Sequence, residues 1–252
     1  MKTDFNPWVR YYTLNQTQLL AIDWEDPYAL NPLERRRITA SLQQFQRGEH
    51  SEGKYLLHQA RTYFKDGDDG GYVEALKGLI REEQRHAMTL GRFMKQQDIP
   101  RLRQHWVDDV FRFLRRMSGL PVSINILTVA EVIAAVYYQG LKYATESRVL
   151  QQLCNQILWD EAQHLAFQVC TLQHFYEKMP GWKARLHRAG QKFLLAGTIP
   201  LVWWQHRSVL KCGGFTLRSF GQACWKTYRE IWHFSPADIK QEIGDWWLEH
   251  SV

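Results

Sequence analysis

A short pattern of acidic residues and histidine occurs twice in this chain and limits the folds open to it more than any other feature. The pattern is an acid followed by Glu-x-x-His, first at Glu82-Glu83-Gln84-Arg85-His86 and again at Asp160-Glu161-Ala162-Gln163-His164. On a helix, a Glu and a His three residues apart project from one face, so both can bind one metal ion and the carboxylate can bridge to a second. One copy would be typical of a solvated helix surface. Two copies on two core helices favour a metal site if partner carboxylates lie nearby.

The rest of the chain is also helical in character. Apolar residues recur at steps of three and four, strand-like alternation is nearly absent, and 252 residues contain only eight prolines, which predicts an all-α fold. The expected helices cover about residues 32–64, 72–97, 101–117, a segment that Pro121 opens, 146–178, 183–210 with a kink or break at Pro200, 216–233, and a short tail helix from Ser235. Because no linker is evident, residues 1–252 are expected to form a single domain.

Two further glutamates match the doubled pattern. Glu131 is the only acid in the apolar run from Leu120 to Leu141, and a buried lone carboxylate is costly unless a metal or a counter-charge stabilises it. A salt bridge to one arginine is the alternative explanation. Glu52 precedes Glu83 by 31 residues and Glu131 precedes Glu161 by 30, which predicts two similar helix hairpins. The interval of 48 positions from Glu83 to Glu131 leaves room for a crossover helix at 101–117.

This pattern resembles the ferritin-like di-iron carboxylate superfamily, whose four-helix bundles use one Glu from each of two helices and Glu-x-x-His from each of the other two. That superfamily includes rubrerythrins, ribonucleotide reductase small subunits, multicomponent monooxygenases and acyl-carrier-protein desaturases. The resemblance covers about residues 33–178, and residues 181–252 are expected to add further helices. It implies six ligands, which are Glu52, Glu83, His86, Glu131, Glu161 and His164.

Four carboxylates and two imidazoles suit iron or manganese, whereas a structural zinc site would usually recruit thiolates. The sequence therefore predicts two Fe ions, with a Mn/Fe pair as the alternative, and O2 as a co-substrate. The four cysteines form no C-x-x-C pair, so a rubrerythrin-type electron-donating iron centre is not expected. An external reductase or ferredoxin is then needed to supply electrons.

Three more acids are expected close to the ligands. Glu49 and Glu52 share a helix face, and the matching interval favours Glu52 as the ligand and Glu49 as an outer or channel acid. Asp160 and Glu82 are predicted to accept the outer imidazole hydrogen of the histidine on the opposite helix, which would fix its tautomer. For Glu82 a plain surface charge is the alternative.

The neighbours of Glu131 indicate the class of substrate but not its identity. Small and apolar residues on its helix face indicate an apolar cavity for an organic substrate or O2, and tyrosines close to Glu52 and Glu131 in sequence can approach the cluster, although no catalytic role is assigned to them. The candidate pocket residues are Tyr55, Thr128, Ala134, Ala135 and Tyr138. The expected activity is O2-dependent hydroxylation or desaturation of a small-molecule or carrier-bound apolar substrate. The alternatives are a ferroxidase or iron-storage protein, a manganese/iron ligand-binding oxidase and, more remotely, a tRNA hydroxylase.

The C-terminal part is basic and rich in tryptophan. Between Trp182 and Glu230 there are nine Lys or Arg residues and one acid. This part either covers the bundle, shapes a substrate tunnel, docks an acidic carrier protein or contacts an anionic membrane surface. No run of about 20 uninterrupted apolar residues and no secretory leader is evident, so a cytoplasmic protein, as a monomer or homodimer, is expected.

Overall fold

The structure is a computed structural model that describes residues 3–49, 53–64, 70–102 and 119–233. Within these ranges the chain is all-α and contains no strand, which confirms the predicted fold class. The helices are α1 Asn6–Leu14, α2 Pro32–Glu49, α3 Lys54–Tyr63, α4 Tyr72–Gln96, α6 Leu120–Tyr143, α7 Arg148–Lys178, α8 Gly181–Cys212 and α9 Leu217–Glu230, followed by the short 3-10 helix η1 Ile231–His233.

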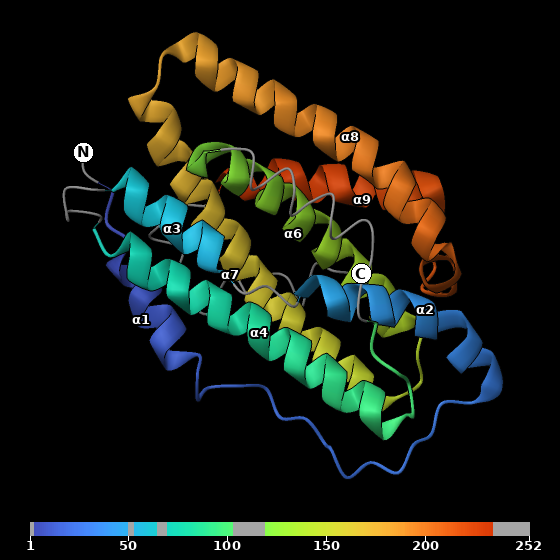
Figure 1. The fold of residues 1–252 in the computed structure, drawn as a ribbon. Coiled ribbons are helices and arrows are strands. Elements are labelled where there is room, and N and C mark those ends of the chain that lie inside the picture. The colour runs from blue at the N-terminus through green and yellow to red at the C-terminus, as the bar shows by residue number, and fades with distance from the viewer. Residues whose placement is uncertain (1–2, 50–52, 65–69, 103–118, 234–252) are drawn as a thin grey trace.

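The centre of the molecule is surrounded by three long helices, α4, α6 and α7, and by a fourth that is divided into α2 and α3 (Figure 1). The most extensive contact is between α6 and α7, and α4 packs against α7 on one side and against α2 and α3 on another. The C-terminal helices α8 and α9 contact each other and lie against α6, so they cover the outer side of the bundle. The C-terminal part therefore covers one side of the bundle by packing against α6.

The central helix α6 is almost completely enclosed by protein. It is the one helix in the described ranges that is long and apolar enough to cross a membrane, and 78% of its apolar segment is buried inside the protein. It contacts α7, α8, α9 and α3. Its apolar composition is therefore explained by packing on several sides.

The helix expected at 32–64 is two helices in the structure. Helix α2 is described as far as Glu49 and α3 begins at Lys54, with Gly53 between them in the left-handed region at φ 63°. A Cβ at Gly53 would lie 2.5 Å from a methyl carbon of Ile80, so both the conformation and the space require glycine. At Pro200 the expected break is absent, because α8 runs through it. The connecting helix at 101–117 and the tail helix from Ser235 lie essentially outside the described residues.

Replacing Gly53 by alanine should lower the free energy of unfolding by about 1–3 kcal/mol, because the side chain would meet Ile80 in a strained backbone conformation. Gly190 is the matched control, since it lies within α8 with open space around its Cα. There, alanine should stabilise the helix by about 0.5–1 kcal/mol. Urea unfolding of both variants tests this, and equal effects at the two sites would contradict the role of Gly53.

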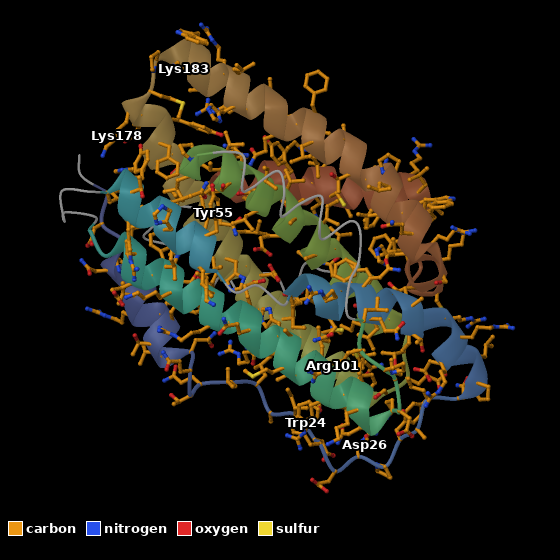
Figure 2. The ribbon with its side chains drawn as sticks, in the orientation of Figure 1. Trp24, Asp26, Tyr55, Arg101, Lys178 and Lys183 are labelled. Carbon is orange, nitrogen blue, oxygen red and sulfur yellow. The ribbon has the colours of Figure 1, made fainter. Side chains whose placement is uncertain are left out.

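An N-terminal helix and strap complete the fold. Helix α1, which the sequence analysis did not predict, packs on α4, with Trp8 and Tyr12 fully buried. The segment from residue 16 to 31 then runs along the edge of the bundle to α2, and Figure 2 labels Trp24 and Asp26 on it. Its backbone is held by glutamines of the bundle, as when Leu20 N donates to Gln156 Oε1 at 2.7 Å. The strap thereby covers part of α4 and α7.

Candidate metal centre

The two copies of the doubled pattern meet in the interior. Two overlapping groups of ligand-type side chains form there, and the ligand atoms within each group all lie within 4.8 Å of one another. One group is Glu49, Glu83, His86 and Glu161, and the other is Glu83, Glu131, Glu161 and His164. Glu83 and Glu161 belong to both. This arrangement offers two neighbouring metal positions, each with one terminal glutamate and one histidine, and two carboxylates able to bridge between them.

The atoms that face the centre are buried and lack hydrogen bonds. These are Oε1 of Glu83, both carboxylate oxygens of Glu161, and Nδ1 of His86 and His164. Several approach one another without forming a hydrogen bond, since His164 Nδ1 lies 3.0 Å from Glu83 Oε1 and His86 Nδ1 lies 3.6 Å from Glu49 Oε2. Buried polar atoms are rarely left without a hydrogen-bond partner. Carboxylate oxygens and imidazole nitrogens that converge without one therefore fit the ligands of a bound metal ion.

The outer nitrogen of each histidine contacts a carboxylate from the opposite helix. His86 Nε2 lies 2.8 Å from Asp160 Oδ2, and His164 Nε2 lies 3.0 Å from Glu82 Oε2. These are the two contacts that the sequence predicts, and Glu82 is buried rather than a surface charge. When each Nε2–H donates to its carboxylate, the Nδ1 lone pair faces the centre, which is the tautomer that binds a metal.

The two terminal glutamates each accept a hydrogen bond. The hydroxyl of Tyr138 donates to Glu49 Oε1 at 2.5 Å, and Gln168 Nε2 donates to Glu131 Oε1 at 3.0 Å. Gln168 is a site residue that the doubled pattern does not include, although its position four residues after His164 places it on the same face of α7. Glu131, the one acidic residue of α6, is thus hydrogen-bonded to a side-chain amide in the described structure.

A polar network surrounds Asp160 and Glu82. Asn15, at the end of α1, donates through Nδ2 to Asp160 Oδ1 at 2.8 Å and also to Glu82 Oε1. Arg85 Nη2 lies 2.8 Å from Asp160 Oδ2, and Gln156 Nε2 donates to Asp160 Oδ1 at 2.9 Å. The sequence analysis missed Asn15 and Arg85 as parts of the site. The signal for α1 was present in Pro7 followed by an i, i+4 pair of aromatic residues, Trp8 and Tyr12.

The electrostatics of the cluster favour a cationic occupant. Burial, together with the charges of Glu131 and Glu49, raises the pKa of Glu83 to about 8, and burial and Glu131 raise that of Glu161 well above its ordinary value. Burial opposes protonation of His86, but Asp160 and Glu49 outweigh it and raise its pKa to about 10. Four carboxylates this close repel one another, and two divalent cations would balance their charge.

Of the two glutamates considered for the first-helix ligand, the structure describes Glu49, and the prediction of Glu52 stays a prediction. Glu49, expected as an outer or channel acid, belongs to one of the two groups, whereas Glu52 lies outside the described residues. The interval assumed one helix from 32 to 64, but the left-handed Gly53 separates α2 from α3. In the described part of the chain, Glu49 is therefore the α2 residue that completes the site.

The expected pocket residues have different surroundings. Tyr55, labelled on α3 in Figure 2, is 41% exposed, so its side chain is not enclosed beside the buried cluster. Thr128, Ala134 and Ala135 are buried on α6, and the Thr128 hydroxyl donates to Ile124 O at 2.8 Å. Tyr138 contacts the ligand Glu49 directly.

A pocket of about 300 Å³ adjoins the centre from the side of His86. It lies between the strap, α4 and α7, and its wall is mostly apolar, with Leu20, Trp24, Met88 and Leu153 among the lining residues. His86 itself forms part of the lining. The volume of the pocket is at the lower end of the usual range for small-molecule sites. None of the residues expected around Glu131 lines it.

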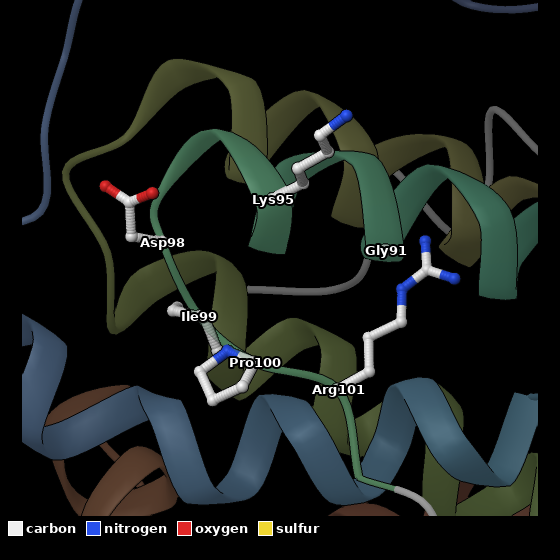
Figure 3. Close-up of a pocket in the computed structure, with 6 residues that line it drawn as sticks. All are labelled: Gly91, Lys95, Asp98, Ile99, Pro100 and Arg101. Atoms are coloured by element: carbon white, nitrogen blue, oxygen red, sulfur yellow. The ribbon is translucent and has the colours of Figure 1, made fainter.

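Figure 3 shows a separate pocket of about 440 Å³ near the C-terminal end of α4. It is lined by Gly91, Lys95 and residues 98–101, and the Arg101 guanidinium points toward Gly91. No residue of either ligand group lines this pocket. It therefore lies apart from the candidate metal centre.

The Tyr138 contact gives a direct test of the Glu49 position. Tyr138→Phe should weaken binding of the ion next to Glu49 and His86 by about 10–100-fold, because Glu49 loses the donor that orients it. Titration of the metal-free protein with Fe(II) under anaerobic conditions measures this. Tyr143→Phe is the matched control, since Tyr143 lies exposed at the end of α6. Unchanged affinity in Tyr138→Phe would contradict the assignment of Glu49 as a ligand.

Comparison with protein-family models, with curated proteins and with solved structures found no match.

Proposed function

We propose that this chain is a ferritin-like di-iron protein that uses O2 to oxidise an apolar organic substrate. The observation that carries the proposal is the pair of buried ligand groups that share Glu83 and Glu161. A single metal site would need one group, and a structural site would not need two bridging carboxylates. Oxygen and nitrogen donors without thiolate favour iron or manganese over structural zinc.

The residues present fit such a centre. Glu49 and His86 would hold one ion, Glu131 and His164 the other, and Glu83 and Glu161 would bridge them. When bound, a pair of ferrous ions supplies two electrons to O2, and a reductase or ferredoxin returns them afterwards. Four carboxylates and two neutral imidazoles would leave the loaded cluster close to neutral, which suits its burial.

The chain's own groups orient the ligands and exclude water. Asp160 and Glu82 hold the two imidazole rings from outside, while Tyr138 and Gln168 hold the terminal glutamates. Glu161, His86 and His164 are almost completely buried, so bulk water has little access from their side. A positioned, dry cluster is what controlled oxidation of an organic molecule requires.

The apolar pocket next to His86 supports the substrate class. Leucine, isoleucine and tryptophan side chains line it, and it opens between the strap and the bundle. An apolar molecule would be desolvated there close to the metal centre. The proposed route for the substrate is therefore this pocket rather than the cavity expected around Glu131.

The test is oxidation chemistry in the isolated protein. Anaerobically reduced, Fe(II)-loaded protein should consume O2 and develop a near-ultraviolet absorption band, and the same protein loaded with Zn(II) should do neither. Added electrons from a reductase should restore the reduced spectrum and allow repeated turnover. Protein that binds iron but shows no change on exposure to O2 would overturn the oxidase proposal while leaving the metal centre intact.

A further inference from the structure

Helix α8 has two apolar faces. Its inner face packs on the bundle through buried residues such as Leu195, Val202 and Val209. The opposite face carries an outer stripe, which consists of Trp182, Leu186, Phe193 and Trp204, with exposed fractions of 59%, 64%, 80% and 64%. The steps of four, seven and eleven residues between them place all four side chains on one side of the helix. Packing within the described part of the chain does not explain the outer stripe.

The charge on α8 has one sign. The helix contains no Asp or Glu, and its exposed side chains include Lys183, Arg185, Lys192, Arg207 and Lys211. Two of these cations lie over rings of the outer stripe, since Lys183 Nζ is 5.5 Å from the Trp182 ring centre and Arg207 Cζ is 5.5 Å from that of Trp204. The outer stripe is therefore an apolar and aromatic surface bordered by positive charge.

The shape of the molecule leaves this surface free to meet a flat partner. Figure 1 shows α8 at the outer edge of the molecule, with α9 and α6 on its inner side, and Figure 2 labels Lys183 at its beginning. A helix of 32 residues is about 48 Å long. Large exposed aromatic and aliphatic side chains arranged in one line over such a length are uncommon on a monomeric protein surface.

We propose that the outer stripe of α8 binds the surface of an anionic lipid bilayer, with the helix lying in the plane of the interface. Tryptophan and phenylalanine enter the headgroup and acyl boundary, and lysine and arginine pair with lipid phosphates beside them. A second copy of this chain is a poorer partner, because two such faces would bring their cations together. No α8 residue belongs to either ligand group, so this inference stands apart from the metal chemistry.

The test is flotation of the full chain with vesicles of two compositions, phosphatidylcholine alone and phosphatidylcholine mixed with phosphatidylglycerol. The protein should float with the mixed vesicles and should bind them more weakly as salt is raised. The double variant Phe193→Ser and Trp204→Ser should bind about tenfold or more weakly. The charge variant Arg185→Glu and Lys192→Glu should lose a similar factor at low salt.

Matched controls separate the outer stripe from general surface effects. Leu14 and Leu33 are exposed on α1 and α2, so Leu14→Ser with Leu33→Ser removes similar apolar surface elsewhere and should leave binding unchanged. Circular dichroism and metal content show whether each variant remains folded. Wild-type protein that stays unbound with both kinds of vesicle would overturn the proposal. So would a Phe193/Trp204 variant that binds as well as wild type, or a protein that binds single-stranded RNA and no vesicles.

Discussion

Glu161→Ala should empty both metal positions, so that metal content falls from about two ions per chain to near zero. Glu161 belongs to both ligand groups, and both of its oxygens are buried without a hydrogen bond. Its loss would therefore remove a ligand from each ion and leave Glu83 as the one carboxylate shared by the two groups. The measurement is elemental analysis of protein reconstituted anaerobically with Fe(II) and freed of excess iron.

Two comparisons make this result specific. Glu131→Ala should lower the metal content to about one ion per chain, because Glu131 belongs to one group alone. Glu74→Ala should change nothing, since Glu74 is an exposed residue of the same helix as Glu83 and pairs only with Lys77 in the described contacts. Retention of both ions by Glu161→Ala would show that Glu161 does not bridge.

Asp160→Ala should lower the free energy of unfolding of the metal-free protein by about 3–5 kcal/mol. Asp160 is fully buried and accepts contacts from His86, Arg85, Asn15 and Gln156. Burial alone would favour its neutral form, but His86 and Arg85 lower the pKa of Asp160 to about 2, so it is held as a carboxylate. Alanine would leave these buried donors, one of them a guanidinium, without their acceptor.

Urea unfolding in the presence of a chelator measures this loss without a contribution from metal binding. Asp160→Asn keeps one acceptor oxygen and should lose less than Asp160→Ala. The surface control Asp23→Ala should change stability by about 0.5 kcal/mol or less. A loss for Asp160→Ala no larger than that of Asp23→Ala would contradict the network drawn around α1, α4 and α7.

The parts of the site that sequence predicts best are those with a local pattern. Glu83 and His86 share one helix face through their spacing, as do Glu161 and His164, and Glu131 is conspicuous as the lone acid of an apolar helix. Local spacing places each pair on one face of its helix, whatever the way in which the helices pack together. The bounds of α4, α6 and α7 follow from the same periodicity.

Features that depend on distant or irregular contacts escaped prediction. The interval that favoured Glu52 over Glu49 assumed an uninterrupted helix, but the left-handed Gly53 separates α2 from α3, so the interval does not decide between the two glutamates. Asn15 reaches Asp160 across 145 positions of the chain, and no local spacing encodes that contact. The pocket beside His86 likewise exists only because the strap lies over α4 and α7.

The central claim is that two ions share Glu83 and Glu161, and an anomalous difference map at the iron edge tests it most directly. Crystals of the full chain loaded anaerobically with Fe(II) should show two peaks in the interior, both in contact with Glu83 and Glu161. One peak should also contact Glu49 and His86, and the other Glu131 and His164. A single peak, or no peak at these side chains, would contradict the account.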